Sequence, residues 1–339
     1  MNEWKSWLKA DPTEWLLEEE NPSVRYFTLT DIWGKPQTNP EVRQAKKEIM
    51  EKGVVPRILA KQREGGYWGK KEDFYVRAKY KGTVWQLFVL AELGADGKDE
   101  RVRKACEFVL GISQDRQSGS FSYLGTSEEG GFHHAVLPCL TGNMVWSLIK
   151  FEHLENPRVQ RGIEWIAKYQ RFDDGDGKAP KGWPYDKREP CWGKHTCYLG
   201  IVKALKALAE IPEARRTVDV KHVIGQGAEY LLRHRLFKRS HNLSQVIKPK
   251  WTRFGFPLMW DTDALEMAGL LTRLGYRDSR MQEAIDLILS KQDKQGRWPL
   301  EETFNGRFLV NIEQKGKPSK WVTLQALRVL KNCDIILKL

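Results

Sequence analysis

The chain has 339 residues and a formal net charge of +12. Hydrophobic residues make up 41% of it and charged residues 29%, so a disordered or collagen-like chain is excluded and a sizeable core is possible. No apolar run approaches the roughly 20 residues that a bilayer span needs. The N-terminal stretch MNEWKSWLKADPTEWLLEEEN is charged where a signal peptide is apolar, and the five cysteines are scattered. Together these features predict a cytoplasmic protein with reduced thiols.

The positive charge belongs to the second half of the sequence. Residues 1–170 hold 25 Lys and Arg against 24 Asp and Glu, whereas residues 171–339 hold 31 against 20. Between Glu229 and Asp261 there is no acid, and the basic segment from Arg233 to Arg253 contains Arg233, Arg235, Lys238, Arg239, Lys248, Lys250 and Arg253. This segment predicts an anionic partner, namely a phosphate, a diphosphate, a nucleic acid or an acidic glycan; the alternative is a solvated basic face.

Taken in chain order, two kinds of helix alternate. One kind is apolar on more than one side and is predicted over residues 21–34, 83–94, 141–154, 196–208, 263–275 and 322–330. The other kind carries a single apolar stripe at the helical period and is predicted from residue 41 to 52 and within VRKACEFVLGISQ, VQRGIEWIAKYQ and MQEAIDLILSKQ.

A loop with a shared pattern follows several of the striped helices. The loops KQREGGYWG (61–69), SQDRQSGSFS (113–122), YQRFDDGDGKAPKGWPYD (169–186) and KQDKQGRWPLE (291–301) each contain Gln, a polar stretch, Gly and an aromatic residue. A unit of striped helix, loop and buried helix that recurs along the chain indicates stacked helical pairs. We therefore predict an all-α fold, an (α/α)6 toroid with six inner and six outer helices. It forms a single domain over residues 21–339 after an N-terminal extension of residues 1–20. An open solenoid of helical pairs is the alternative.

The Gln, Gly and aromatic loops resemble the QW repeat of the terpenoid cyclases. The register of the paired helices resembles the protein prenyltransferase β subunits of the same superfamily. The resemblance covers roughly residues 20–330, and it implies an isoprenoid or similarly apolar ligand in a central cavity.

The segment TRFGFPLMWDTDALEMAGLL (252–271) resembles the Asp-x-Asp-Asp segment of class II terpenoid cyclases. The resemblance makes Asp263 the candidate general acid and Asp261 its neighbour, with Ala264 where the family has its last Asp. An N-cap role for Asp263 is the alternative, because Asp is a leading capping residue.

The same segment resembles the Asp-x-Cys zinc pair of the prenyltransferases. That likeness implies that Lys250 and Arg253 hold a diphosphate, and GKHTCYLG (193–200) makes His195 a candidate for anion binding or proton transfer. Asp263 stands in place of the zinc-binding Cys and KPSKWVTL (317–324) has no His, so no metal and no cofactor is predicted. A zinc cluster of Cys139, Cys191, His195 and Cys197 is an open alternative, although their spacing is not a recognised chelating pattern.

Several other side chains stand near the starts of the buried helices and are candidates for binding a ligand. These substrate-binding candidates are His133, His134, Trp192, Tyr198, Trp260 and Trp321. Aromatic rings can stabilise a carbocation through cation–π interactions, or they can simply fill the core. We favour cavity lining for Trp260 and Trp321, and a satisfied core histidine is the alternative for His195.

Two functions follow from these observations. The first is a terpenoid cyclase-like or prenyltransferase-like enzyme. The second is a protein that binds or cleaves a polyanion, either nucleic acid or acidic polysaccharide, through the basic segment. No phosphate-binding glycine loop or serine-hydrolase elbow is present, and DDGDG (173–177) lacks the Glu that a calcium-binding EF-hand loop requires.

Overall fold

The computed structural model describes residues 3–335, and the chain divides into two compact units. Unit 1 comprises Met1–Ala60, Leu231–Leu258 and Thr262–Leu339, and unit 2 comprises Lys61–Tyr230 and Met259–Asp261. Helices dominate both units, and the strands are short hairpin pairs. Within residues 3–335, every helix is too short or too polar to cross a bilayer.

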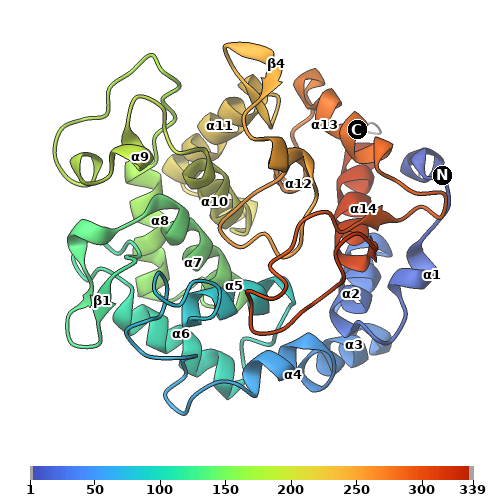
Figure 1. Cartoon of the computed structure of the whole chain (residues 1–339), viewed down its shortest axis with the longest axis horizontal. Coiled ribbons are helices and arrows are strands. Elements are labelled where there is room, and N and C mark those ends of the chain that lie inside the picture. Colours follow the sequence, from blue (N-terminus) through green and yellow to red (C-terminus); the bar gives the residue numbers. More distant parts are fainter. Residues whose placement is uncertain (1–2, 336–339) are drawn as a thin grey trace. The chain divides into compact units, whose positions relative to one another are not determined.

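Unit 2 contains three helices that are buried on nearly every side. They are α5 (Thr83–Glu92), α7 (Pro138–Lys150) and α10 (Tyr198–Ala209). Helices α7 and α10 lie side by side (Figure 1). Gly142 allows this approach, because a Cβ atom there would lie 2.5 Å from the Lys203 carbonyl. Striped helices flank them, namely α6 (Glu100–Ile112), α8 (Pro157–Tyr169) and most of α11 (Val218–Arg233).

Unit 1 repeats the same alternation. Its buried helices are α2 (Pro22–Phe27), continued by the π-helix η2 (Thr28–Ile32), α12 (Ala264–Arg273) and α14 (Lys320–Ile335). Its other helices are α3 (Pro40–Glu51), α4 (Val54–Leu59) and α13 (Gln282–Ser290). Within the predicted extension, η1 (Glu3–Trp7) and α1 (Thr13–Leu16) pack against α14.

Short elements complete the chain. The turns of helix are η3 (His133–Ala135), η4 (Tyr185–Lys187), α9 (Glu189–Trp192), η5 (Glu213–Arg215), η6 (Pro249–Thr252) and η7 (Ser279–Met281). The strands pair as β1 (Gly125–Thr126) with β2 (Gly130–Gly131), β3 (Lys238–Arg239) with β4 (Asn242–Val246), and β5 (Trp298–Pro299) with β6 (Pro318–Ser319), all antiparallel.

The striped helices or the turns before them begin in a common way. The side chains of Asn39, Asp99, Asn156 and Asp278 each accept a hydrogen bond from the backbone N–H two residues later, at 2.9 Å in every case. Such caps satisfy donors that the first turn of a helix leaves free, and each stabilises it by about 1 kcal/mol.

The glutamine of the repeated loop reaches the start of the next striped helix. The Nε2 group of Gln62 donates to the Arg101 carbonyl at 2.8 Å, and that of Gln114 donates to the Arg158 carbonyl at 2.7 Å. Gly119 then takes a left-handed backbone conformation with φ of 84° against α8, where a Cβ atom would lie 2.6 Å from Arg161 Cβ. A side chain at that position would push the loop away from the helix.

A second hydrogen bond ties each repeated loop to the buried helix that follows it. The backbone N–H groups of Trp68, Phe121, Asp173 and Trp298 donate to the Oγ1 atoms of Thr83, Thr141, Thr196 and Thr323, at 3.2, 3.0, 3.0 and 2.9 Å. Every one of these threonines is buried. One loop N–H is thus bonded to a threonine hydroxyl at the start of each of four buried helices.

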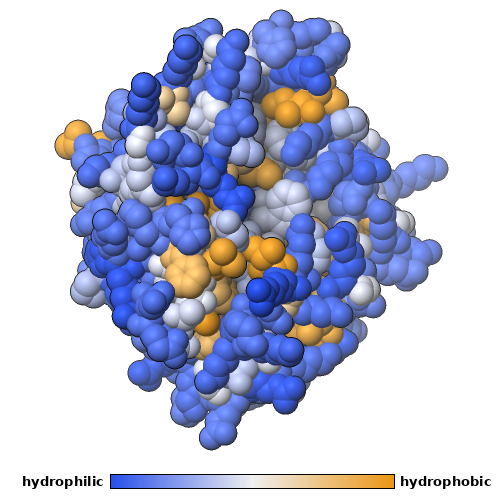
Figure 2. Space-filling view, turned by 60° about the vertical axis from the view of Figure 1, so that its left-hand side comes forward, coloured by the Kyte–Doolittle hydropathy of each residue, from blue (hydrophilic) through white to orange (hydrophobic). Residues whose placement is uncertain are grey.

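The surface is mainly polar. Figure 2 shows one face of the molecule, on which hydrophilic side chains predominate and hydrophobic ones form small groups between them. Among residues 3–333 the most exposed large hydrophobic residue is Val218, at 83%. This distribution is typical of a water-exposed protein surface.

We predict that Thr141→Val destabilises the protein by about 1–3 kcal/mol, because the buried Phe121 N–H loses its acceptor while the volume of the side chain is kept. The measurement is urea unfolding followed by circular dichroism. Thr38→Val is the matched control, since Thr38 is exposed and is expected to change stability by less than about 0.5 kcal/mol. Equal effects of the two substitutions would contradict the proposed anchoring role.

Candidate functional site

Asp263 is the N-cap of α12 and, like the four threonines described above, accepts a hydrogen bond from the N–H of a preceding loop. Its Oδ1 atom accepts from the Glu266 N–H at 2.8 Å, and its Oδ2 atom accepts from the Gly255 N–H at 3.0 Å. The residue is 1% exposed. The capping alternative is therefore confirmed, and both carboxylate oxygens are engaged by backbone donors. The general-acid role stays a prediction.

Asp261 lies in unit 2 together with Trp260, whereas Asp263 belongs to unit 1. Asp261 is 5% exposed. Trp260 donates its Nε1 hydrogen to the Tyr80 hydroxyl at 3.3 Å, and the Lys79 Nζ atom lies 5.1 Å from the centre of the Trp260 ring. The segment is held further by Asn143, whose Nδ2 group donates to the Met259 carbonyl at 3.2 Å.

Three other predicted aromatic residues are buried in ring clusters. Trp321 is 1% exposed and stacks on Phe256 with ring centres 4.3 Å apart. Tyr198 packs edge-on against Tyr230 at 5.5 Å, and its burial raises its pKa well above the ordinary value. Trp192 is also 1% exposed. All three occupy core positions in the described structure, and their contact with a ligand stays a prediction.

The cations of the basic segment are partly neutralised within unit 1. Arg253 lies 2.6 Å from Glu302, and Arg235 lies 2.6 Å from Glu283. Lys238 also bonds to Glu283, and this bond is the largest cause that lowers the pKa of that carboxyl. Lys250 is half-buried in η6. The segment therefore presents less free positive charge than its sequence suggests.

His195 is the more exposed of two histidines that lie beside an acid. Its side chain is 55% exposed, and its Nδ1 atom lies 3.5 Å from Asp174 Oδ1. At that separation the two groups form a loose ion pair when the histidine is charged. The adjacent Thr196 is the threonine that anchors the loop through Asp173.

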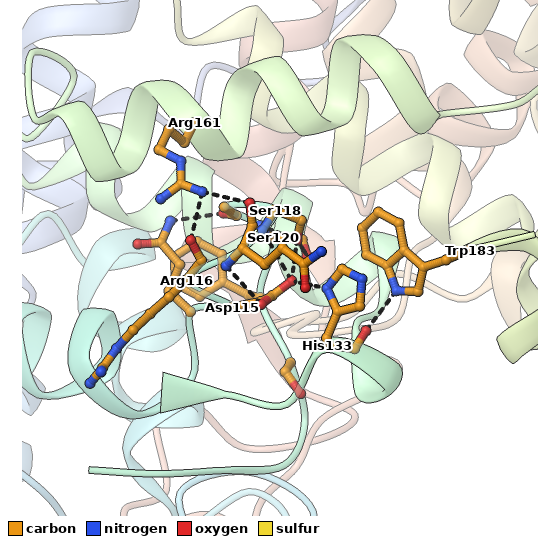
Figure 3. Close-up of polar contacts among 12 residues, drawn as sticks. Asp115, Arg116, Ser118, Ser120, His133, Arg161 and Trp183 are labelled. Carbon is orange, nitrogen blue, oxygen red and sulfur yellow. Dashed lines mark hydrogen bonds and ion pairs between the residues drawn. The ribbon is translucent and has the colours of Figure 1, made fainter. Parts of the chain in front are cut away.

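His133 forms the compact pair. Its Nδ1 atom lies 2.7 Å from Asp115 Oδ2, and the histidine side chain is 34% exposed while that of Asp115 is 4% exposed (Figure 3). His133 stands in η3, just before α7, and Asp115 lies in the repeated loop that follows α6. A short hydrogen bond to a buried carboxylate fixes both the tautomer and the orientation of an imidazole.

Asp115 is itself held firmly. Its Oδ1 atom accepts from the Gln117 N–H at 3.0 Å, and its Oδ2 atom accepts from the Ser118 N–H at 3.2 Å and from the Ser118 hydroxyl. The Ser118 and Ser120 hydroxyls are bonded to each other at 2.7 Å. These donors fix the carboxylate, so its position does not depend on the histidine.

Trp183, from the long loop between α8 and α10, covers one face of His133. The two rings are nearly parallel, with centres 4.0 Å apart, and the indole Nε1 group donates to the His133 carbonyl at 2.7 Å. Tyr169 packs edge-on against Trp183 at 5.2 Å. The imidazole is thus fixed by a carboxylate on its Nδ1 atom and by an aromatic ring on its face.

The neighbouring His134 has a different environment. It is exposed and packs near Phe132 at 5.9 Å, and no acid is bonded to it among the described residues. Of the predicted histidines, only His133 therefore has the fixed geometry of an acid–base group.

Asp115 and Trp183 were not among the sequence candidates. Asp115 directly follows Gln114 in the repeated loop, and Asp293 follows Gln292 in the same way, where its Oδ1 atom accepts from the Gln295 and Arg297 N–H groups. The sequence signal at Asp115 is therefore that of a turn residue. Nothing in it indicates a partner 18 residues later.

Within residues 3–335, no three His, Cys, Asp or Glu side chains form a group that could hold a metal ion. The alternative zinc cluster of Cys139, Cys191, His195 and Cys197 therefore does not form among the described residues.

Comparisons with known proteins bear on the fold. A scan against protein-family models gives no match, and neither does a search of curated protein sequences. Among solved structures, the chain is similar to an unsaturated glucuronyl hydrolase specific for heparin, with a TM-score of 0.51 and 10% identity over 95% of this chain and 87% of that one. This likeness confirms the predicted all-α toroid fold.

Two further solved structures show weaker likeness. One is the type II terpene cyclase MstE from Scytonema, with a TM-score of 0.44 and 16% identity over 94% of this chain and 88% of that one. The other is a sugar epimerase from a ruminal bacterium, with a TM-score of 0.43 and 14% identity over 74% of this chain and 71% of that one. At these scores neither adds to the argument.

We predict that Asp263→Ala destabilises the protein by about 1–3 kcal/mol, because the Glu266 and Gly255 N–H groups lose their acceptor. Asp263→Thr is expected to recover at least half of that loss, since threonine can cap a helix and threonine hydroxyls accept the loop N–H in four other places. Urea unfolding of the two variants, compared with the unsubstituted protein, measures the difference. Variants of equal stability would show that Asp263 does not act as the anchor of its loop.

Proposed function

We propose that the chain is an α/α-toroid enzyme that transfers protons through His133, oriented by Asp115. The observation that supports this most strongly is the 2.7 Å hydrogen bond between a buried carboxylate and a partly exposed imidazole. A candidate acid–base residue must be both fixed and accessible. Among the described histidines of unit 2, His133 combines these properties best.

The geometry supports a definite protonation pattern. A carboxylate only accepts hydrogen bonds, so the Nδ1 atom of His133 carries a hydrogen and donates it to Asp115. The lone pair of the neutral ring is then on Nε2, which can accept a proton from a substrate. When the ring becomes charged, the adjacent carboxylate stabilises the imidazolium, so the same residue can return the proton.

For the substrate we propose an anionic sugar, such as a uronic acid unit of an acidic polysaccharide. Arg188 lies 4.2 Å from the Tyr123 ring, and the Tyr123 N–H donates to the carbonyl of Ala135 in the turn that holds His133. Among the described residues no carboxylate lies within 4 Å of Arg188. An arginine stacked on Tyr123, whose backbone is bonded to the turn that holds His133, suits a substrate carboxylate or sulfate. The similar solved structure of a heparin-specific glucuronyl hydrolase agrees with this choice of substrate.

A terpenoid cyclase-like activity on an isoprenoid ligand is the second candidate. An aromatic group in unit 2 favours it: Tyr75 stacks on Trp85 at 4.6 Å, Tyr80 lies 5.2 Å from Trp85, and Trp260 bonds to Tyr80. Asp261 directly follows Trp260. Aromatic rings beside an acid suit a carbocation mechanism. In this candidate we assign the acid role to Asp261, because the Asp263 carboxylate caps α12.

We predict that His133→Asn lowers kcat by about 10² to 10⁴-fold on the active substrate, because the proton acceptor is lost. The assay offers unsaturated heparin disaccharides and geranylgeranyl diphosphate to the full chain, with product detection by mass spectrometry. His222→Asn is the matched control, and it is expected to retain activity because that histidine is an exposed residue of α11 outside the predicted site.

The results separate the two candidates. Turnover of the disaccharide that depends on His133 supports the first candidate, and turnover of the isoprenoid that depends on Asp261 supports the second. Equal activity of the His133 and His222 variants would contradict the acid–base assignment. A nucleic-acid affinity that falls steeply between about 50 and 200 mM salt, with no turnover of either compound, would favour the polyanion-binding alternative instead.

A further inference from the structure

Three of the five cysteines lie at the adjoining ends of two buried helices in unit 2. Cys139 is in the first turn of α7, Cys197 caps α10, and Cys191 is in the short helix α9 just before it. The remaining two are elsewhere, with Cys106 fully buried in α6 and Cys333 in α14. All five are free thiols.

Cys191 and Cys197 face each other across a tight chain reversal. Trp192 and Thr196 form an antiparallel bridge, and the Cys197 N–H donates to the Cys191 carbonyl at 3.0 Å on its outer side. That bond, together with the covalent N–Cα, C=O and Cα–C lengths, limits the distance between the two Cα atoms to about 7 Å at most. Disulfides join residues whose Cα atoms are roughly 4.4–6.8 Å apart. The hydrogen bond therefore keeps these two residues within reach of a disulfide with little movement of the backbone.

The three thiols are also close enough to interact electrostatically. Burial raises the pKa of Cys191 to about 12, and the neighbouring Cys197 thiol contributes to the rise. Burial likewise raises the pKa of Cys139, with further contributions from Cys197 and Cys191. Helices α7 and α10 bring Cys139 close, since a Cβ atom on Gly200 would lie 3.2 Å from Pro138 and 3.9 Å from the Cys197 Cβ atom.

We propose that Cys191 and Cys197 form a reversible disulfide, which makes the loop between α9 and α10 a redox-sensitive modification site. The oxidant is a small-molecule disulfide such as oxidised glutathione. Cys197 reacts first with the oxidant, because it is half-buried while Cys191 is 8% exposed.

The exchange balances in two steps. The Cys197 thiolate attacks one sulfur of oxidised glutathione, so a mixed disulfide forms and one glutathione leaves as a thiolate that takes up a proton. The Cys191 thiol then loses its proton, its sulfur attacks that of Cys197, and the second glutathione leaves. Two cysteine thiols are oxidised, and one glutathione disulfide is reduced to two thiols.

The new bond would change the segment that it encloses. It closes a loop containing Trp192 and His195, and it joins the cap of α10 to α9. Because thiolates are the attacking species, the raised pKa of Cys191 makes the second step faster at pH 9 than at pH 7.

Tryptic digestion tests the assignment directly. The full chain is incubated with oxidised glutathione, its free thiols are alkylated, and it is digested without reduction. Trypsin cleaves after Lys194, which lies between the two cysteines, so the peptides Glu189–Lys194 and His195–Lys203 stay joined only through the disulfide. We expect this linked pair, the loss of two free thiols out of five, and complete reversal by dithiothreitol.

Three variants keep the test decisive. Cys139→Ala is expected to retain the linked pair, whereas Cys191→Ser is expected to leave Cys197 as a glutathione adduct alone. Cys106→Ala controls for general effects of removing a buried thiol. Thermal unfolding monitored by circular dichroism checks that each variant is folded. A Cys139–Cys197 linked pair, a stable adduct on Cys197 in the unsubstituted chain, or no oxidation at pH 9 would overturn the proposal.

Discussion

One hydrogen bond recurs wherever a repeated loop meets the buried helix that follows it. A backbone N–H of the loop donates to a buried threonine hydroxyl in four repeats, and to the carboxylate of Asp263 in a fifth. A buried N–H without an acceptor lowers the stability of the fold, so this bond fixes the position of each loop against the helix that follows it. The glutamine bonds of Gln62 and Gln114 fix the other side of their loops against the next striped helix. The site side chains of unit 2 extend from loops that are held in this way.

The Asp115–His133 pair depends on this anchoring. The loop of Asp115 is fixed by Gln114 and by the Phe121 bond to Thr141, and His133 stands just before α7, which carries that threonine. The two residues of the pair therefore come from two segments that are joined by the Phe121–Thr141 hydrogen bond. Trp183 comes from the next loop along the chain, and its bond to the His133 carbonyl joins the two loops. Proton transfer by a histidine needs this kind of rigidity, because a small displacement of the ring lowers its efficiency.

The helices were predictable because their signals are local. The apolar stretch from Thr83 predicts a buried helix, and α5 occupies it; the single stripe of 159–170 predicts an outer helix, and α8 occupies it. The cap role of Asp263 was also open to prediction, since capping depends on neighbouring residues. The pairing of His133 with Asp115 was not predictable, because it depends on how the chain folds between two residues that lie 18 positions apart. Trp183 lies 50 residues from the carbonyl that it binds, and no pattern in the sequence connects the two. The resemblance to cyclase repeats predicts an acid role for Asp263, whereas in the structure its carboxylate accepts hydrogen bonds from two backbone N–H groups.

Loops that are hydrogen-bonded at both ends can vary in sequence and length between those bonds without disturbing the helices. The segment between α8 and α10 is an example, since Asp173 is tied to Thr196 while the residues between them carry Trp183, Tyr185 and Trp192. Insertions among residues 176–182, which are exposed or half-buried, cost little, because lengthening a surface loop adds only a small entropic penalty. Transplanting such a stretch from one toroid protein to another is therefore a practical route to new ligand preferences on an unchanged scaffold.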